Sequence, residues 1–376
     1  MPAGSSARSA FLFSSGDRPL GLVSSRLTTD DTPKDNLVRP RRASSPTMAP
    51  SKTPQITVLG SLNIDLTSYV PHHPLPGETL TSNSVVISPG GKGANQAVAC
   101  AKLSRSRDAP NDTAAESASV SMIGAVGSDS YGDLLLKNLG EHGVHTDRIA
   151  VGDNLKTGMA IIVVDEPTGQ NRIILAPEAN YAVTPDKFGT LPGTLDPKPD
   201  LLVMQLEVPL ETVLAALRSA KAAAVPVLLN PAPAQRLPDE AYDGLAHLVV
   251  NETEAAILSG YDESELDTPD GLKRVGEWFM AKKVRNVIIT LGGRGVYYTN
   301  QDGATELISA QKVKVVDTTA AGDTFVGSYC VAAVDAQAKG EAFDISVAIT
   351  NANRAAAKTV ERKGAQTSIP WRDELQ

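Results

Sequence analysis

Aromatic residues, cysteines and long apolar runs are all scarce in this chain of 376 residues. Aromatic side chains are only 4% of the residues, so the core must consist of Val, Ile, Leu and Ala, as in parallel sheets covered by helices. No stretch reaches the roughly 18–20 uninterrupted apolar residues of a membrane span, so we expect a soluble protein. The two cysteines, Cys100 and Cys330, lie far apart in apolar helical sequence, which indicates buried thiols in a reducing compartment and argues against a disulfide framework.

Metal-binding histidine patterns and an excess of positive charge are missing as well. None of the five histidines pairs with a cysteine at the spacing of a zinc site. The formal net charge of −8 gives no overall attraction to nucleic acid or to an anionic membrane. A small polyanion can still bind where backbone amides and a cation neutralise it locally.

The chain divides by composition into an N-terminal extension, 1–53, and a regular domain, 54–376. The extension is rich in Ser, Arg, Pro and Thr without periodic apolar positions, so we predict that it is disordered. Two other interpretations stay open: translation that begins at Met48, and an organelle transit peptide, against which the acidic residues from Asp17 onward argue. A polar, low-complexity stretch at 104–119 predicts a mobile surface insert.

Short apolar runs alternate with helical patterns throughout the regular domain. This alternation predicts a three-layer α/β/α fold with a mostly parallel central sheet. The segment 65–88 alternates polar and β-branched residues around the turn Pro76-Gly77, and predicts a small antiparallel flap over that sheet. The expected strands are 56–60, 120–126, 160–164, 201–206, 225–229, 247–250 and 287–291, and the expected helices include 210–223, 271–283 and 343–358.

The run DTTAAGDTFVG, Asp317–Gly327, is the strongest local motif. It places a tight turn of small residues before a predicted helix at 323–334, where free backbone N–H groups and the positive end of the helix suit a phosphoryl group. Asp323 would then lie beside the anion site and accept the proton of an attacking hydroxyl. The alternative interpretation is that Asp323 is only a helix N-cap.

Two further motifs predict a site for a polyhydroxylated ligand. The turn Gly90-Gly91-Lys92-Gly93-Ala94-Asn95 lets backbone approach a ligand and offers Lys92 and Asn95 as hydrogen-bond donors, although a plain helix-start turn is the alternative. It lacks the spacing of a Walker A loop. Asn63 and Asp65 lie two apart, so extended backbone would point both to one side, where they could grip adjacent hydroxyls. A turn with an Asx motif explains them equally well.

Two loops are candidates for a nucleotide site. Asn251-Glu252-Thr253-Glu254 follows a predicted strand and puts an amide and a carboxylate on one helical face, where the carboxylate could hold Mg²⁺ through water. Thr290-Leu291-Gly292-Gly293-Arg294-Gly295 follows the next strand and is rich in glycine, which allows close approach to phosphates. Taken singly, either loop could be purely structural.

In combination and in this order, the motifs resemble the ribokinase (PfkB) family of carbohydrate kinases. The likeness covers about Ile56 to Trp371 and adds PGET, MQLE, NPAPA and RKGAQTSIPW to the motifs above. GGKGAN together with NPAPA and KGAQ favours the ribokinase branch over fructokinase and adenosine kinase relatives. The N-terminal extension and the insert at 104–119 have no counterpart in a typical member.

The resemblance implies a role for each matching position. It implies a catalytic base at Asp323 and an anion hole at Ala320, Ala321 and Gly322. It implies sugar binding by Asn63, Asp65, Gly91, Lys92, Asn95, Glu207 and Asp323. It implies ATP binding around Asn251, Glu254, Thr290, Leu291, Gly292, Gly293, Arg294, Gly295, Gly322 and Asn353, with Glu254 also affecting Mg²⁺. It implies a site for an activating K⁺ at Asp317, Thr319, Thr359, Arg362, Gly364 and Ser368.

The function implied is ATP-dependent phosphorylation of D-ribose at O5, by in-line transfer to give ribose 5-phosphate and ADP. Alternatives are a kinase of the same family that acts on fructose, adenosine or deoxyribose, and a sensor protein that binds without transfer, against which the intact Asp323 argues. The resemblance also implies a homodimer formed through a β-lid at 65–88 and 160–175. We expect a cytoplasmic or also nuclear location, with mitochondrial targeting by residues 1–50 as the alternative.

Overall fold

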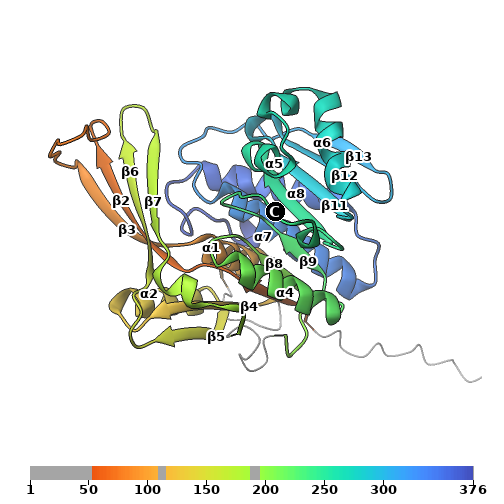
Figure 1. Cartoon of the computed structure of the whole chain (residues 1–376), viewed down its shortest axis with the longest axis horizontal. Helices are drawn as coiled ribbons and strands as arrows, with labels where there is room; N and C mark the ends of the chain where they lie inside the picture. Colours follow the sequence, from red (N-terminus) through yellow and green to blue (C-terminus); the bar gives the residue numbers. More distant parts are fainter. Residues whose placement is uncertain (1–52, 109–115, 187–194, 376) are drawn as a thin grey trace, which may run out of the picture. The chain divides into compact units, whose positions relative to one another are not determined.

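A nine-stranded sheet forms the centre of the described chain, in the order β13-β12-β11-β10-β9-β8-β1-β4-β5 (Figure 1). The structure is a computed structural model that describes residues 53–108, 116–186 and 195–375. The strands β11 to β5 run parallel, and β12 and β13 add an antiparallel edge. In this order the strands are Thr305–Ile308, Val296–Asn300, Asn286–Thr290, His247–Asn251, Val227–Leu229, Leu201–Met204, Gln55–Leu59, Ser119–Gly127 and Val144–Gly152.

Helices cover both faces of this sheet and bury one apolar core on each side. Alternate residues of a strand point to opposite faces, so Val203 packs in the core beneath α1 and α7 while Met204 packs in the core beneath α4 and α6. The predicted three-layer α/β/α fold is therefore confirmed. The helices are α1 Lys92–Ser104, α2 Ser130–Glu141, α4 Leu210–Ala222, α5 Glu252–Ser259, α6 Pro269–Ala281, α7 Ala321–Lys339 and α8 Ile345–Val360.

A second sheet of four strands, in the order β3-β2-β6-β7, stands at the left of Figure 1. Strand β2 is antiparallel to β3 but parallel to β6, which in turn is antiparallel to β7. The expected antiparallel flap at 65–88 is thus one half of a mixed sheet, whose other half contains the lid strands expected around 160–175. Its strands are β2 Asn63–Val70, β3 Ser84–Gly90, β6 Gly158–Asp165 and β7 Asn171–Ala176.

The two segments without family counterparts fall mostly outside the described residues. Of the expected extension at 1–53, residues 1–52 lie outside them, as do residues 109–115 of the expected insert. Helix α1 ends at Ser104, and the described ends of the insert are joined by a buried ion pair between Arg105 and Glu116. Arg105 also donates to the carbonyl of Gly143 at 2.8 Å, which ties the insert's base to the loop before β5.

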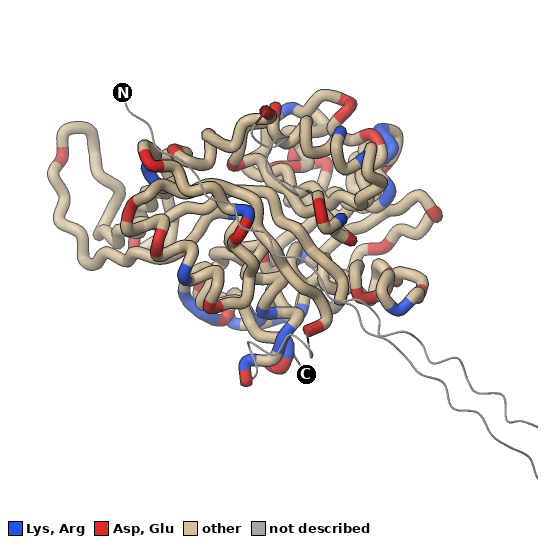
Figure 2. Tube along the Cα trace, turned by 90° about the horizontal axis from the view of Figure 1, so that it is seen from below, with Lys and Arg blue, Asp and Glu red and all other residues tan. Residues whose placement is uncertain are grey.

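The described chain shows neither a segregation of charge nor a membrane-spanning helix. Acidic and basic residues are interspersed along the trace in Figure 2. None of the helices in the described ranges combines the length and the apolar character needed to cross a bilayer.

Candidate active site

The carboxyl ends of four parallel strands carry the predicted motifs to one edge of the main sheet. Strand β1 leads into Gly60–Asp65, β8 into Gln205–Glu207, β10 ends at Asn251 and β11 ends at Thr290. Loops at this edge are where ligands bind in open α/β sheets. The N-termini of α1 and α7 lie at the same edge. Asn95 and Gln96 of α1 donate hydrogen bonds to Asp323 in the first turn of α7.

Asp323 is a buried carboxylate held by two side-chain amides of α1. Its exposed fraction is 8%, and its two oxygens accept hydrogen bonds from Asn95 Nδ2 at 3.1 Å and Gln96 Nε2 at 3.0 Å. The alternative role of an N-cap does not apply, since α7 begins at Ala321 behind Ala320 and has no side-chain cap. A carboxylate fixed by two donors keeps its remaining lone pairs available for a proton in a defined direction.

The first turn of α7 leaves backbone amides open. Within the described chain, the N–H groups of Gly322 and Asp323 find no acceptor. Ala320 takes a left-handed conformation with φ 59°, and a Cβ added to Gly322 would meet no heavy atom within 4 Å. Of the expected anion-hole residues, Ala321 differs, because its N–H donates to the carbonyl of Thr318 at 3.3 Å. The open amides at the positive end of a helix can bind an anion.

The first turn of α1 shows the opposite arrangement, because the protein itself satisfies its amides. Glu207 accepts from the backbone N–H of Lys92 at 3.0 Å and from the hydroxyl of Ser61. Ser61 in turn accepts the N–H groups of Gly93, through its hydroxyl, and Ala94, through its carbonyl. Glu207, a predicted sugar ligand, therefore stabilises this helix start in the structure. The contrast leaves α7, and not α1, as the helix end open to an anion.

Asn63 and Asp65 both lie on β2, as the extended-backbone prediction requires. Asn63 is buried, and its Oδ1 accepts a hydrogen bond of 2.7 Å from Asn180 Nδ2. This contact leaves the amide NH₂ of Asn63 as the group that can donate to a ligand. Burial, together with the nearby charges of Glu207 and Asp323, raises the pKa of Asp65 to about 7.

Lys92 supplies a positive charge among these acidic groups. Burial alone would lower its pKa, but the attraction of Asp323, Glu207, Glu254 and Asp65 outweighs burial and holds the pKa above its ordinary value. Lys92 is therefore an ammonium group at neutral pH. Lys92 therefore interacts electrostatically both with predicted sugar-binding residues and with a predicted nucleotide-binding residue, Glu254.

The predicted nucleotide residues divide into two groups by their contacts. Asn251 and Glu254 form a capping box at the start of α5, with reciprocal hydrogen bonds of 2.8 and 2.9 Å, so helix capping explains both residues locally. Burial raises the pKa of Glu254 above its ordinary value. On α8, the Nδ2 atom of Asn353 is buried without a hydrogen-bond partner, as expected of a donor that a ligand satisfies.

The glycine-rich loop after β11 contains a short helical turn, Gly292–Arg294. Arg294 is anchored away from this turn, with an ion pair to Glu252 at 2.6 Å and a hydrogen bond to the carbonyl of Leu266 at 2.8 Å. Its side chain therefore holds the loop in place. Space is open beside Gly292 and Gly293, because a Cβ on either would meet nothing within 4 Å, although the carbonyl of Gly292 accepts from the N–H of Gly295.

Of the predicted cation-binding residues, Asp317 and Gly364 join the turn before α7 to the segment after α8. Asp317 accepts from the N–H and hydroxyl of Thr319 through one oxygen, and from the N–H of Gly364 at 2.9 Å through the other. These hydrogen bonds, against the effect of burial, hold the pKa of Asp317 below its usual range. Thr359 lies beneath α7, where its hydroxyl donates to Thr324 Oγ1 at 2.9 Å. No group of three or more acidic, His or Cys side chains in the described ranges forms a metal cluster.

Arg362 and Ser368 are the other two residues predicted for the cation. Arg362 pairs with Glu374 at 2.7 Å, and the hydroxyl of Ser368 donates to the carbonyl of Ala365 at 2.7 Å. Both side chains thus stabilise the C-terminal segment around 362–375. The Arg362 side chain cannot bind a cation, so its contribution would have to come from its backbone carbonyl, whereas the hydroxyl oxygen of Ser368 keeps lone pairs that could.

Sequence reasoning did not identify several residues that hold the site together. Gln96 follows Asn95 directly in the motif GGKGANQ, but the motif does not indicate its contact with Asp323. In the structure its Oε1 also accepts from Gln205 Nε2 at 2.6 Å. Asn180 also accepts from the backbone N–H of Leu62 at 2.8 Å. A buried amide in a sequence has no pattern of its own, so these contacts become visible only in the fold.

A separate cavity of about 480 Å³ opens at the other edge of the sheet, before the strands β9, β10 and β11 begin. Leu217, Ala246 and Arg285 are among its lining residues. Lys221, also at the cavity, pairs with Asp243 at 2.5 Å, so part of its charge is already neutralised. None of the predicted site residues lines this cavity.

Known proteins resemble the chain over almost all of its described length. A family model described as "pfkB family carbohydrate kinase" matches residues 53–372. A ribokinase from Schizosaccharomyces pombe is 42% identical over 321 residues, which are 84% of this chain and 94% of that protein. A deoxyribokinase from Salmonella typhi is 35% identical over 316 residues, or 84% of this chain and 95% of that protein.

The structural comparison agrees with the sequence comparison. The structure of Arabidopsis thaliana ribokinase complexed with ribose and ATP is similar with a TM-score of 0.73 at 28% identity. The match covers 86% of this chain and 98% of that one. A family model over most of the chain, relatives above one-third identity and a shared fold agree with the site motifs. The chain belongs to the pfkB family of carbohydrate kinases.

Proposed function

We propose that the protein transfers the γ-phosphoryl group of ATP to O5 of D-ribose, giving ribose 5-phosphate and ADP. The observation that carries this proposal is the buried carboxylate of Asp323, fixed by Asn95 and Gln96 directly beside the open amides of α7. A proton acceptor next to an anion site is what transfer from a triphosphate to a hydroxyl requires. The named relatives that phosphorylate ribose support the choice of sugar.

In this mechanism each group acts on a defined atom. Asp323 takes the proton of the sugar hydroxyl, and that oxygen attacks the γ-phosphorus in line with the departing ADP. The N–H groups of Gly322 and Asp323 donate to the phosphoryl oxygens as charge gathers on them. Lys92 balances the negative charge of the acidic groups around it, and Asn63 and Asp65 hold the sugar hydroxyls.

Two cations complete the proposal. Glu254 is the residue that we assign to the hydration shell of Mg²⁺, which when bound with ATP would neutralise charge on the phosphate oxygens. The segments joined through Asp317 and Gly364 would hold K⁺ mainly by carbonyl oxygens, which suits a weakly hydrated cation. The role that we assign to this cation is to fix the shape of the turn before α7. The joined segments support this, because Asp317 already ties residue 364 to that turn.

A sugar panel tests the proposed substrate. The full chain is incubated with MgATP and, separately, D-ribose, 2-deoxyribose, fructose and adenosine, and ADP formation is followed with and without K⁺. D-ribose should give the highest kcat/KM. A higher value for deoxyribose would favour deoxyribokinase activity, which one of the relatives is named for. If none of the four compounds gave rise to ADP, the kinase assignment would be contradicted.

The pKa of Asp65 predicts that sugar binding depends on pH. An ionised carboxylate accepts more hydrogen bonds from sugar hydroxyls than a protonated one, and this group has a pKa of about 7 without ligand. Sugar affinity should therefore fall as the pH drops below 7, approaching about tenfold per unit. Calorimetric titration with ribose from pH 5.5 to 8.5 measures it. The Asp65→Asn variant should bind more weakly and lose this pH dependence, and an unchanged pH dependence would contradict the assignment.

We also propose that the small sheet forms a homodimer contact. The adjacent residues Ile173 and Ile174 on β7 point to opposite faces and are 55% and 64% exposed, so both faces of this sheet carry uncovered apolar surface. One face can cover the sugar while the other packs on a second copy. The Ile174→Asp variant should shift from dimer to monomer in sedimentation velocity. Leu307→Asp, on β13 and 47% exposed, is the matched control, and a wild-type monomer would contradict the proposal.

For the cellular location we propose the cytoplasm, with the nucleus as a further site. The acidic net charge and the two free, buried cysteines are compatible with a reducing compartment. Fluorescent fusions of the full chain and of a form lacking residues 1–47 test this directly. Mitochondrial signal that disappears with the truncation would contradict it.

A further inference from the structure

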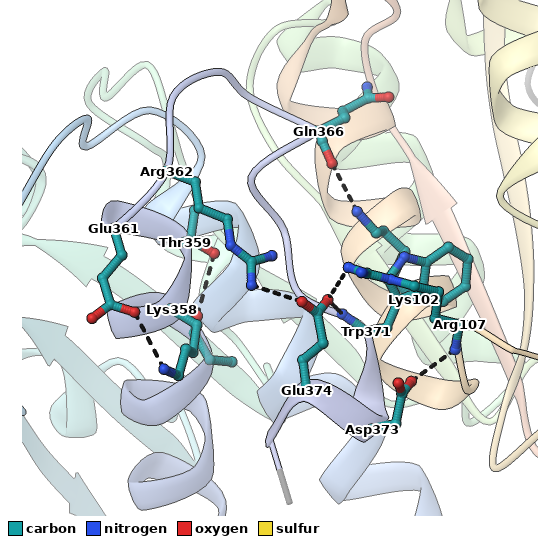
Figure 3. A network of polar contacts seen from close by, with 11 residues as sticks. Lys102, Arg107, Lys358, Thr359, Glu361, Arg362, Gln366, Trp371, Asp373 and Glu374 are labelled. Carbon is teal, nitrogen blue, oxygen red and sulfur yellow. Dashed lines mark hydrogen bonds and ion pairs between the residues drawn. The ribbon is translucent and has the colours of Figure 1, made fainter.

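The C-terminal segment around 362–375 is fastened to helix α1 by Lys102 (Figure 3). Lys102 is only 4% exposed, and its Nζ donates to the backbone carbonyl of Gln366 at 3.0 Å. The same ammonium lies over the ring of Trp371, 5.5 Å from its centroid. One lysine of α1 thus fixes the backbone of the segment at Gln366 and packs against it at Trp371.

Gln366 uses its side chain to reach the candidate active site. The residue is 4% exposed, and its Nε2 donates to Asn95 Oδ1 at 3.0 Å. Its Oε1 accepts from Asn138 Nδ2 of α2 at 2.6 Å. Asn95 in turn donates to Asp323 Oδ2 at 3.1 Å. Three amides therefore form a chain from α2, through the C-terminal segment and α1, to the carboxylate.

The carboxylate dictates the direction of this chain. An ionised Asp323 can only accept, so Asn95 must present its NH₂ group to it. The Oδ1 of Asn95 then faces Gln366 and requires a donor there, which only the NH₂ group of Gln366 provides. Conversely, the donor from Gln366 excludes the flipped amide of Asn95, which would place an acceptor against the carboxylate.

We propose that Gln366 is a positioning residue for the phosphoryl transfer, acting through Asn95 on the catalytic base. This inference rests on the proposed function of Asp323. Gln366 holds the Asn95 amide in the one orientation that donates to Asp323, and so sets where the free lone pairs of the base point. The C-terminal segment is thereby a working part of the active site, although Gln366 does not itself hydrogen-bond to the base.

Removing the donor at residue 366 tests the proposal. Gln366→Met keeps the length and apolar bulk of the side chain but cannot donate to Asn95. We expect kcat to fall about 10- to 100-fold, as for a misaligned reactive group, while KM for ATP stays at the wild-type value. Thr367→Ala is the matched control, because Thr367 is exposed and its hydroxyl donates to the carbonyl of Lys363 at 3.5 Å, and its kcat should be unchanged. A Met variant with wild-type kcat would overturn the proposal.

A second substitution protects the test against misfolding. Gln366→Glu keeps the size and the acceptor for Asn138, yet an ionised glutamate cannot donate to Asn95. A general packing role predicts that kcat falls only as far as the unfolding midpoint falls, whereas the proposed role predicts a loss of kcat in the Glu variant that is comparable to or larger than that in the Met variant. A Glu variant with wild-type kcat and an unchanged unfolding midpoint would contradict the positioning role.

A double-mutant cycle with Asn95 separates positioning from other effects. If Gln366 acts through Asn95, the Gln366→Met change should cause no further loss of kcat in an Asn95→Ala background. If it acts through the neighbouring predicted cation site or through general packing, the two losses should multiply, and that result would overturn the proposal. The same cycle measured by urea unfolding should show coupled shifts in midpoint. This coupling does not depend on turnover, so it would remain even if the proposed kinase function were wrong.

Discussion

Replacing Asp323 with Asn should lower kcat by about 10²- to 10⁴-fold while the KM values for sugar and ATP stay close to those of the wild type. An amide cannot take the hydroxyl proton, so the attacking oxygen must keep it until late in the transfer. Shape and volume are conserved, and the sugar contacts from β2 and the open amides of α7 remain. The loss should therefore appear in the chemical step, measured as steady-state kcat at saturating ribose and MgATP.

Two observations guard this prediction. Asp335→Asn, on the same helix but in an exposed ion pair with Lys339, should leave kcat unchanged. In the Asp323→Asn variant, the new NH₂ group must face the NH₂ group of Asn95 or of Gln96, and two donors that face each other lower stability. The unfolding midpoint should therefore be measured together with the rates. An Asp323→Asn variant that is folded and retains near-normal kcat would remove the base from the mechanism.

Gly91→Ala should strongly disrupt the sugar-binding turn. Gly91 has a φ of 88°, and a Cβ there would lie 2.7 Å from the backbone nitrogen of Asn63 and 2.9 Å from the carbonyl oxygen of Ser61. Neither backbone atom can move aside cheaply. The left-handed conformation and the overlap should each lower the free energy of unfolding by about 1–3 kcal/mol.

The same change should impair function more than stability alone explains. To relieve the overlap, β2 must move away from the start of α1, which separates Asn63 from Asn95 and from Asp323. We expect kcat/KM for ribose to fall by about 100-fold or more. The control is Gly303→Ala, which has a φ of 83° but no neighbour within 4 Å of the added Cβ and so carries only the conformational strain. Equal losses in both variants would show that the close approach at Gly91 has no role.

The sequence predicted the scaffold well where apolar runs are continuous. The buried strands β1, β4, β8, β10 and β11 were expected, because each contains a short run of mostly apolar residues. Strand β5 was not, since only Val144 and Ile149 of it are buried and polar residues interrupt its apolar positions. The hairpin of β12 and β13 was also missed, because β13 is exposed and short and has no pattern that distinguishes it from a loop.

The candidate site was only partly predictable, for a physical reason. The motifs gave the residue types, but not which atoms face each other. Asn95 and Gln96 are neighbours on a helix and point about 100° apart, yet both reach Asp323, because α7 packs very closely on α1. Gly327 permits that approach, since a Cβ there would lie 2.4 Å from the Cβ of Ala99. Contacts that depend on such helix packing are absent from any local pattern.

For Glu207, too, the sequence predicted the position but not the atoms that it contacts. Its place after β8 was expected at the sugar site, and one of its two carboxylate oxygens, Oε2, accepts from the backbone N–H of Lys92 and the hydroxyl of Ser61. The structure thus gives this residue a role in shaping the site. Whether it also contacts a sugar hydroxyl stays a prediction.

The position of the transferred phosphate tests the account most directly, because it reports the base, the anion site and the sugar contacts together. The full chain is incubated with D-ribose and MgATP, and the product is identified by ³¹P NMR. The account predicts ribose 5-phosphate formed in step with ADP, and almost none with Asp323→Asn under the same conditions. Phosphate on a different hydroxyl, or ATP hydrolysis that does not depend on the sugar, would contradict it.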